Sequence, residues 1–382
     1  ACVYNKEWAG VKKRNERHCH GRMGEKSYIC RNFSCMQLSC HKLLVTGASG
    51  FVGSFLVEHA LAAGAEVWAA VRPTSSRRYL TDGRIRFVEL DLGDEATLRR
   101  QIEAHVGAEG PWTACIHVAG VTKCLHEYDF FRVNTEGTLR LARTLQETGA
   151  LRGRFVFVSS LSVMGPVREK PAPDGHGRRY APITDADEPR PDTAYGRSKL
   201  AAERGLARMP GLDYVVLRPT GVYGPRDKDY YLMALSVKRH VDTAAGLRPQ
   251  ELTFVYVRDL ADAALLAIGH GRRGAAYFLT DGGVYGSSTF ARLLQRAMGV
   301  KGLVRISVPL WALRAVCHVA GKLAAARGRT STLNADKYHI MKQRNWQCDT
   351  TSARNDLGWQ PAYDLERGVA ETVAWYKQER WL

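Results

Sequence analysis

Short apolar runs alternate with longer amphipathic stretches from residue 42 onwards. The apolar runs predict strands at 43–46, 66–71, 85–90, 114–118, 154–159 and 214–217. The stretches between them have helical periodicity and predict helices at 51–63, 95–105, 129–147 and 194–208. This alternation is typical of an α/β fold with a doubly wound parallel sheet, because each crossover places a helix on one face of the sheet.

A glycine-rich turn follows the first predicted strand and opens the first predicted helix. Gly47 permits the tight turn, Gly50 lets the backbone approach a pyrophosphate, and Gly53 allows the helix to pack closely. Free N–H groups at the start of the helix attract phosphate. The turn therefore predicts a Rossmann-type fold that binds a dinucleotide. The expected contacts are Gly47, Ser49, Gly50, Phe51, Val52 and Gly53.

The residues at the ends of the next strands indicate which dinucleotide is bound. No carboxylate follows the second strand, where Arg72 and Arg77 stand instead, and such cations suit the 2′-phosphate of NADP. The sequence predicts NAD(P) as cofactor, with NADP favoured over NAD; Arg72 stacked on the adenine is the alternative, and would admit either. Further expected contacts, beside the adenine and along the middle of the cofactor, are Asp91, Leu92, Val118, Ala119 and Gly120.

Three residues point to proton transfer. Tyr195 and Lys199 are four apart in a predicted helix and share a face, so we expect the ammonium to lower the pKa of the phenol from about 10. Ser160, at the end of a strand, would bind the same substrate oxygen, and Lys199 also reaches the ribose of the cofactor. Tyr338 and Lys342 repeat the spacing without these neighbours, which favours a structural role.

These features divide the chain into three parts. Residues 1–41 hold eight Lys and Arg against three Glu and little apolar periodicity, which predicts a disordered basic leader or a non-native extension. Residues 42–221 form the predicted dinucleotide-binding domain. The alternation weakens beyond it, so we expect 222–382 to be a smaller, mainly substrate-binding region interwoven with the sheet domain.

Several motifs together resemble the extended short-chain dehydrogenase/reductases of the NAD-dependent epimerase/dehydratase family. They are TGASGFVG at 46–53, HVAG at 117–120, VNTEGT at 133–138, SSLSVMG at 159–165, YGRSK at 195–199, RPTGVYGP at 218–225 and FVYVRD at 254–259. The resemblance covers residues 42–382. It implies Ser160, Tyr195 and Lys199 as catalytic residues, a homodimer, and cofactor contacts that include Pro219 and Val222.

Departures from the family pattern exclude some of the reactions that members of this family catalyse. Leu161 and Ser162 stand where sugar dehydratases carry an acidic pair, so a carboxylate for eliminating water is missing. Leu252 replaces the arginine that holds the diphosphate in nucleotide-sugar epimerases. Both losses favour an oxidoreductase that moves a hydride between nicotinamide and a carbonyl/alcohol substrate, similar to the 3β-hydroxysteroid dehydrogenases and dihydroflavonol reductases.

Two other functions stay open. The first is a nucleotide-sugar epimerase that works through a transient keto intermediate and holds its substrate with Lys238, Arg239 or Arg272. The second is a dinucleotide-binding sensor without turnover, although such proteins usually lose the Tyr or the Lys. A helix expected at 308–325 either lines a pocket for a hydrophobic substrate or packs Trp311 and Leu313 into the core.

The composition of the chain argues mainly against certain partners, namely nucleic acids, metals and membranes. The net charge of +17 is spread along the chain with no nucleic-acid motif, so we expect a small-molecule substrate and no nucleic-acid partner. Five of the nine cysteines fall within 1–40 without the paired spacing of a zinc site, so we expect no metal. The four remaining cysteines are scattered, which suggests reduced thiols in a cytoplasmic enzyme. Basic residues interrupt the apolar stretch 303–326, which argues against stable membrane insertion.

Overall fold

Seven parallel strands make the central sheet of the computed structural model, which describes residue 38 and residues 41–170, 180–328, 331 and 333–382. The order across the sheet is β11-β6-β5-β4-β1-β2-β3. The strands are β1 (Lys42–Thr46), β2 (Glu66–Val71), β3 (Arg86–Glu89), β4 (Ala114–His117), β5 (Phe155–Val158), β6 (Tyr214–Pro219) and β11 (Ala276–Leu279). Each neighbouring pair is parallel, so the predicted doubly wound α/β fold is confirmed.

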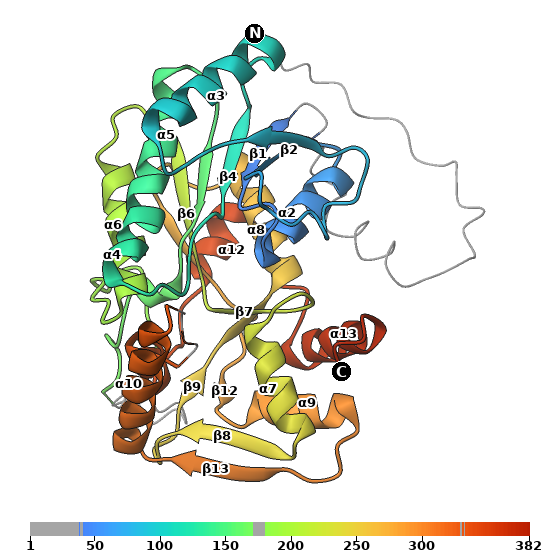
Figure 1. Ribbon diagram of the computed structural model, residues 1–382, viewed down its shortest axis with the longest axis vertical. Coiled ribbons are helices and arrows are strands. Elements are labelled where there is room, and N and C mark those ends of the chain that lie inside the picture. The colour runs from blue at the N-terminus through green and yellow to red at the C-terminus, as the bar shows by residue number, and fades with distance from the viewer. Residues whose placement is uncertain (1–37, 39–40, 171–179, 329–330, 332) are drawn as a thin grey trace, which may run out of the picture. The chain divides into compact units, whose positions relative to one another are not determined.

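Helices cover both faces of this sheet (Figure 1). One face carries α3 (Glu95–Glu109), α5 (Gly137–Glu147) and α6 (Ala194–Ala207), whose apolar side chains share a core cluster with the strands. The other face carries α2 (Phe51–Ala62) and α8 (Val257–Gly269), which pack against each other. Because both faces of the sheet are buried, the sequences of the strands are continuously apolar rather than alternating between apolar and polar residues.

One predicted helix is wrong in its details. The stretch 129–147 was expected as a single α-helix, but it divides into α4 (Glu127–Phe130), a π-helix (Phe131–Glu136) and α5. A π-helical turn inserts an extra residue without changing the apolar periodicity much, so the sequence pattern conceals it. The buried Asn134 lies within this turn.

The chain beyond residue 221 contributes to the sheet domain as well as to a second region. It supplies β11 and α8 to the central sheet and its cover. The remaining elements are β7 (Gly221–Tyr223), α7 (Asp229–Lys238), β8 (Val241–Ala245), β9 (Glu251–Leu252), β10 (Phe254–Tyr256), β12 (Tyr285–Gly286), α9 (Thr289–Met298), β13 (Val304–Val308), α10 (Leu310–Ala326), α11 (Ala335–Lys342), α12 (Thr351–Leu357) and α13 (Leu365–Gln378). Three small two-stranded sheets, β7 with β10, β9 with β12, and β8 with β13, organise this region.

The predicted helix at 308–325 is α10, but only one of its two proposed core residues is buried. Leu313 is 6% exposed, whereas Trp311 is 76% exposed. Two residues apart on a helix are separated by about 200°, so a narrow contact with the rest of the protein cannot bury both side chains. The alternative in which this helix packs both residues into the core is therefore wrong for Trp311 and holds for Leu313.

Other predictions depend on the N-terminal residues. The basic leader 1–41 and its cysteines lie outside the described residues, apart from Leu38 and His41. In the part of the chain that the structure describes, no group of three His, Cys, Asp or Glu side chains is placed to hold a metal ion. Nor does that part contain a helix long and apolar enough to cross a membrane.

The turn between β1 and α2 is built as its glycines suggest. Gly47 has a φ of +67°, in the left-handed region that favours glycine. A Cβ on Gly53 would stand 2.1 Å from the Gly47 carbonyl oxygen, so only glycine lets α2 approach the turn this closely. A Cβ on Gly50 would meet only that same oxygen, at 3.2 Å, which leaves open space in front of its backbone. The turn fits a phosphate group there.

We expect Gly53→Ala to displace α2 from the turn. The overpacking should lower the free energy of unfolding by about 1–3 kcal/mol and weaken dinucleotide binding at least about tenfold. Urea unfolding and a fluorescence titration with NADPH measure the two effects. The matched control is Gly107→Ala in α3, where a Cβ meets nothing within 4 Å. It should stabilise the protein by about 0.5–1 kcal/mol. Equal behaviour of the two variants would contradict this account of the turn.

Candidate active site

The crevice between β1 and β4 is where the strand order reverses, and ligands of such sheets bind outside the carboxyl ends of the strands at this point. A buried histidine joins the two strand ends. His117 Nδ1 lies 2.7 Å from Thr46 Oγ1, and its Nε2 lies 2.9 Å from Thr138 Oγ1. Burial, helped by the Lys199 charge, lowers the pKa of His117 to about 3. This imidazole is therefore a neutral structural link at physiological pH.

The predicted cofactor residues after β4 lie at this crevice. Gly47 fits beneath Ala119, since a Cβ on it would be 2.7 Å from the Ala119 nitrogen. A Cβ on Gly120 would be 2.9 Å from Asn134 Oδ1 and 3.2 Å from Lys199 Nζ. The segment that follows β4 is thus held between the glycine turn and the lysine predicted to act in catalysis.

Helix α6 presents one polar stripe to the carboxyl ends of β5 and β6. Tyr195, Lys199 and Glu203 are spaced four apart along it, as the helical prediction required. Lys199 Nζ donates to the Val158 carbonyl at 3.0 Å. Glu203, one turn further on, forms an ion pair of 2.6 Å with Arg218, and both side chains are largely buried. The stripe carries a charged pair that the sequence did not reveal.

The expected lowering of the pKa of the phenol is wrong. Burial raises the pKa of Tyr195 to about 12, and a side-chain hydrogen bond with Ser160 opposes this rise only in part. Burial also lowers the pKa of Lys199 to about 8, although the Glu203 carboxylate works against it. The prediction considered the attraction between ammonium and phenolate but not the desolvation of both groups.

Ser160 stands at the end of β5, as predicted. Its hydroxyl accepts a hydrogen bond of 3.1 Å from the Ser162 backbone N–H and so begins a short 3-10 helix at Leu161–Val163. This turn holds the Ser160 side chain beside the Tyr195 phenol. The structure therefore brings all three predicted catalytic residues to the same edge of the sheet.

The remaining predicted cofactor residues follow other strands. The guanidinium of Arg72, after β2, is exposed and makes no hydrogen bond or ion pair with any described residue. Arg77 stacks on the Phe87 ring at 4.2 Å and is less free to bind a phosphate. After β3, Asp91 Oδ1 accepts from the Gly93 N–H at 2.8 Å, and Leu92 follows it. Pro219 ends β6, and Val222 lies in β7.

Asn134 is a site residue that pattern reasoning missed. Its side chain is fully buried; Oδ1 accepts from Val121 N at 2.8 Å, and Nδ2 donates to Val121 O and to Ser198 Oγ, each at 3.0 Å. These bonds tie the loop after β4 to α6. Asn134 lies in the π-helical turn, and its place in the VNTEGT motif at 133–138 was the signal that could have singled it out.

Asp336 is the second missed residue, and it comes from the far end of the chain. Its two carboxylate oxygens accept from the backbone N–H groups of Ala194 and Tyr195, each at 3.0 Å. Thr193 Oγ1 accepts from Gly196 N at 2.9 Å. These acceptors satisfy the first N–H groups of α6, and the carboxylate also matches the positive end of the helix. Helix α11 thereby fixes the start of the helix that carries Tyr195.

A second set of contacts strengthens this junction. Asp192, just before α6, lies 3.0 Å from His339 Nδ1 and 3.2 Å from Lys342 Nζ. Tyr338 packs against α10 together with Met341. The repeated Tyr-x-x-x-Lys spacing thus belongs to a helix that supports α6 from outside the sheet.

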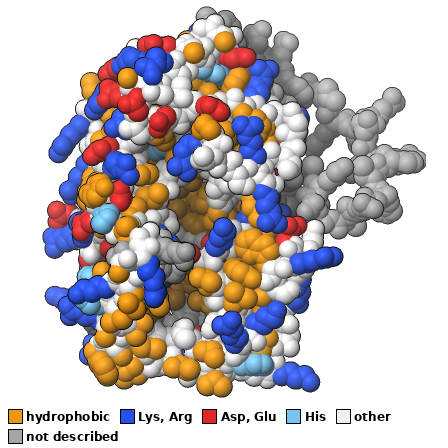
Figure 2. Space-filling model, viewed as in Figure 1, with side chains coloured by type: hydrophobic (Ala, Val, Ile, Leu, Met, Phe, Trp, Pro, Cys, Tyr) orange, Lys and Arg blue, Asp and Glu red, His pale blue; other side chains and the backbone are white. Residues whose placement is uncertain are grey.

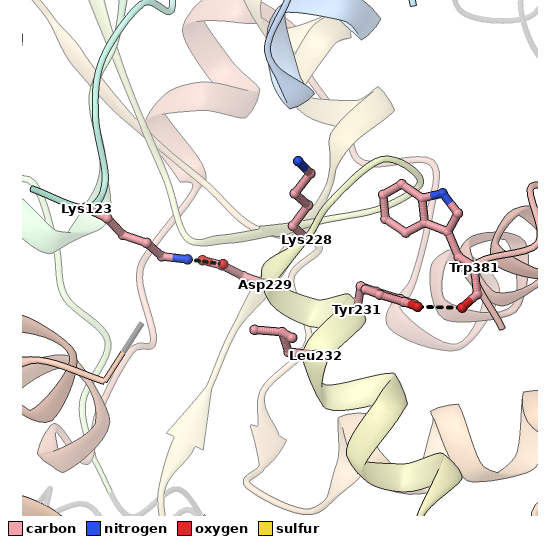
Figure 3. A pocket seen from close by; sticks show the side chains of 6 residues that line it. All are labelled: Lys123, Lys228, Asp229, Tyr231, Leu232 and Trp381. Carbon is pink, nitrogen blue, oxygen red and sulfur yellow. Dashed lines mark hydrogen bonds and ion pairs between the residues drawn. The ribbon is translucent and has the colours of Figure 1, made fainter. Parts of the chain in front are cut away.

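A pocket of about 520 Å³ opens beside the loop after β4 (Figure 3). It is lined by Lys123, Lys228, Asp229, Tyr231, Leu232 and Trp381. Lys123 forms an ion pair with Asp229, whereas the Lys228 ammonium points away from that pair and forms none with a described residue. The lining therefore combines one ion pair and three larger apolar or aromatic side chains with one cation, Lys228, that is not part of that pair.

Comparison with known proteins agrees with this geometry. Residues 43–279 match the model of the NAD dependent epimerase/dehydratase family, which is more than half of the chain. The chain belongs to this family. It is an enzyme of the extended short-chain dehydrogenase/reductase type, as the sequence motifs indicated.

Relatives within the family differ in chemistry. The chain is 27% identical to a UDP-glucose 4-epimerase of Vibrio cholerae over 353 residues, covering 88% of this chain and 95% of the relative. It is 28% identical over 360 residues to a 3-beta-hydroxysteroid dehydrogenase of Mycolicibacterium neoaurum, covering 88% and 91%. The structure of UDP-glucose 4-epimerase from Thermotoga maritima with UDP-glucose superposes with a TM-score of 0.67 at 22% identity, covering 89% and 99%, which supports the fold.

We expect Asp336→Ala to loosen the first turn of α6. Loss of two charged hydrogen bonds should cost about 2 kcal/mol locally, which corresponds to roughly 30-fold faster amide hydrogen exchange at residues 194–197. Exchange measured by mass spectrometry checks this. Asp364→Ala is the control, since Asp364 caps α13 through Arg367 N at 2.8 Å. It should accelerate exchange in α13 and leave α6 unchanged. Unaltered protection of α6 in Asp336→Ala would remove its positioning role.

Proposed function

We propose that this enzyme is an NAD(P)-dependent oxidoreductase that moves a hydride between nicotinamide and a carbonyl/alcohol substrate, with Tyr195 as the acid/base. The observation that carries the proposal is the side-chain hydrogen bond between Ser160 and Tyr195, together with the position of Lys199 beside Gly120, at the carboxyl ends of the strands where the glycine turn would place a dinucleotide. A nearby phenol and a hydroxyl suit the oxygen of a substrate whose carbon exchanges a hydride.

Each of the three residues has a separate role in the proposed reaction. When bound, the dinucleotide supplies the hydride to the carbonyl carbon or accepts it from the alcohol. The Tyr195 phenol gives its proton to the carbonyl oxygen, and its pKa of about 12 keeps that proton available at neutral pH. Ser160 donates a hydrogen bond to the same oxygen. Lys199, held by the Val158 carbonyl, keeps its other N–H donors for the ribose hydroxyls.

The side chains that line the pocket beside the loop after β4 favour a substrate without a diphosphate. Asp229 neutralises Lys123, so only Lys228 is left to meet a negative group. A diphosphate carries at least two charges and usually requires several cations. Leu161 and Ser162 in the turn after β5 provide no carboxylate for removing water from a sugar.

A nucleotide-sugar epimerase is the second candidate, because UDP-glucose 4-epimerases are among the relatives. Of the three cations suggested for it, Arg272 precedes β11 at the opposite edge of the sheet and pairs with Asp356 at 2.8 Å. Lys238 and Arg239 are exposed at the end of α7. These positions of the three cations favour an oxidoreductase over an epimerase.

The cofactor, assembly and location form part of the same proposal. The free Arg72 guanidinium after β2 favours NADP over NAD, since it suits a 2′-phosphate. A homodimer and a cytoplasmic location accompany the family resemblance. The function itself is tested by incubating the protein with NADPH and a panel of apolar ketones and aldehydes, and in parallel with UDP- and GDP-sugars. Oxidation of NADPH with a carbonyl supports the proposal; interconversion of sugars without net oxidation supports the epimerase; binding without turnover supports a sensor.

We expect Tyr195→Phe to reduce turnover by at least about 100-fold with little change in the dissociation constant of NADPH, because only the proton carrier is lost. Stopped-flow reduction of the best carbonyl substrate and a fluorescence titration measure the two quantities. Tyr338→Phe, in the repeated spacing, is the matched control and should retain the rate. Full activity in Tyr195→Phe would place the chemistry elsewhere.

We expect Arg72→Asp to move cofactor preference toward NAD by at least about tenfold, because a carboxylate repels a 2′-phosphate and binds a 2′-hydroxyl. The ratio of kcat/KM for NADPH and NADH measures the preference. Arg78→Asp on the same loop is the control, since Arg78 already pairs with Glu379 at 3.2 Å. If both variants keep the wild-type ratio, Arg72 does not discriminate between the 2′-phosphate of NADP and the 2′-hydroxyl of NAD.

A further inference from the structure

Large hydrophobic side chains are exposed together at one part of the second region. Four of them project from α10, and two more lie on β13, which ends just before it. In Figure 2 hydrophobic side chains gather, with basic ones between them, at the end of the molecule where Figure 1 places α10 and β13. We call this surface the α10 face; it consists of Val304, Ile306, Trp311, Val316, Val319 and Leu323.

Helix α10 has three distinct sides. Leu313 and Cys317 face inward and pack with α11 and β8. Val316, Val319 and Leu323 form an exposed apolar side, with exposures between 49% and 55%. Arg314, His318 and Lys322, spaced four apart, form an exposed basic edge beside it. A helix that already has a buried side does not need this second apolar side for folding.

The chain segment that carries the α10 face supplies charges of one sign only. Residues 282–335 contain no Asp or Glu, although the whole chain has 38, and they contain eight Lys and Arg. Arg305 pairs with Asp242 of β8 at 2.8 Å, but Arg314 and Lys322 form no ion pair with a described residue. A surface that combines apolar side chains with unbalanced positive charge attracts a partner that offers both apolar contact and negative charge.

We infer that the α10 face docks the protein on an anionic phospholipid surface, with α10 lying in the plane of the interface. Trp311, exposed at the start of the helix, matches the residue type that occupies the headgroup boundary, and the basic edge meets the phosphates. A second copy of this chain fits less well, because twofold pairing of the face would bring its unbalanced cations together. The inference does not depend on the reaction proposed above.

The test uses the full chain and sedimentation with vesicles. Wild-type protein should bind vesicles of phosphatidylcholine with 30 mol% phosphatidylglycerol, bind pure phosphatidylcholine much more weakly, and lose most binding in 1 M salt. Arg314→Glu/Lys322→Glu should weaken partitioning at least about 25-fold, since each basic residue near such a surface contributes about fivefold. Arg204→Glu/Arg208→Glu, at the C-terminal end of α6 and its cap, carries the same charge change and should weaken partitioning far less.

A second variant tests the apolar contribution. Val319→Ser/Leu323→Ser leaves the charge unchanged, and its exposed positions should keep the melting temperature close to that of the wild type, yet vesicle binding should fall at least about tenfold. Equal binding by all variants would overturn the inference by showing that the α10 face does not contact the vesicles. An equal loss in the α6 control would overturn it by showing that overall charge is responsible. A concentration-dependent dimer that the serine variant abolishes, with no binding to vesicles, would assign the face to a second copy instead.

Discussion

Burial of the Lys199 ammonium is the constraint around which the site is arranged. The side chain is only 4% exposed, and a buried charge persists only where hydrogen bonds and nearby charges replace water. Val158 supplies one acceptor, and Glu203 supplies a carboxylate one helical turn away, already committed to Arg218. The other N–H donors of Lys199 have no hydrogen-bond partner among the described residues. A ligand with hydroxyl groups would complete this environment, so the same feature that depresses the pKa of the lysine also prepares it to bind.

Several neighbouring features follow from that position. Gly120 must lack a side chain because Lys199 Nζ and Asn134 Oδ1 occupy the space a Cβ would need. Asn134 in turn holds the loop after β4 with hydrogen bonds that a non-polar residue could not make. His117 stays neutral partly because the Lys199 charge opposes its protonation. The crevice is therefore a connected set of polar groups in which each member limits the choice of its neighbour.

The sequence predicted what depends on local spacing. The sheet, the glycine turn, and the positions of Ser160, Tyr195 and Lys199 at strand and helix ends all follow from short-range patterns. It did not predict the Asp336 contact, because a carboxylate 141 residues beyond Tyr195 gives no periodic signal. The raised pKa of the phenol was missed for a related reason, since desolvation depends on every element packed around the group. Trp311 was misplaced because an apolar helix does not reveal which of its sides is covered.

The cap on α6 also has a consequence for how the two parts of the molecule behave. Asp336 of α11 accepts a hydrogen bond from the backbone N–H of Tyr195. The same helix packs against Leu313 and Cys317 of α10. Movement of α10 relative to the sheet would therefore strain the hydrogen bonds that orient the proposed acid/base, or break them. The region expected to receive substrate cannot shift independently of the residue expected to transfer the proton. Because charged caps stabilise a helix start by about a kilocalorie or more, this coupling is strong enough to favour one arrangement of the two parts.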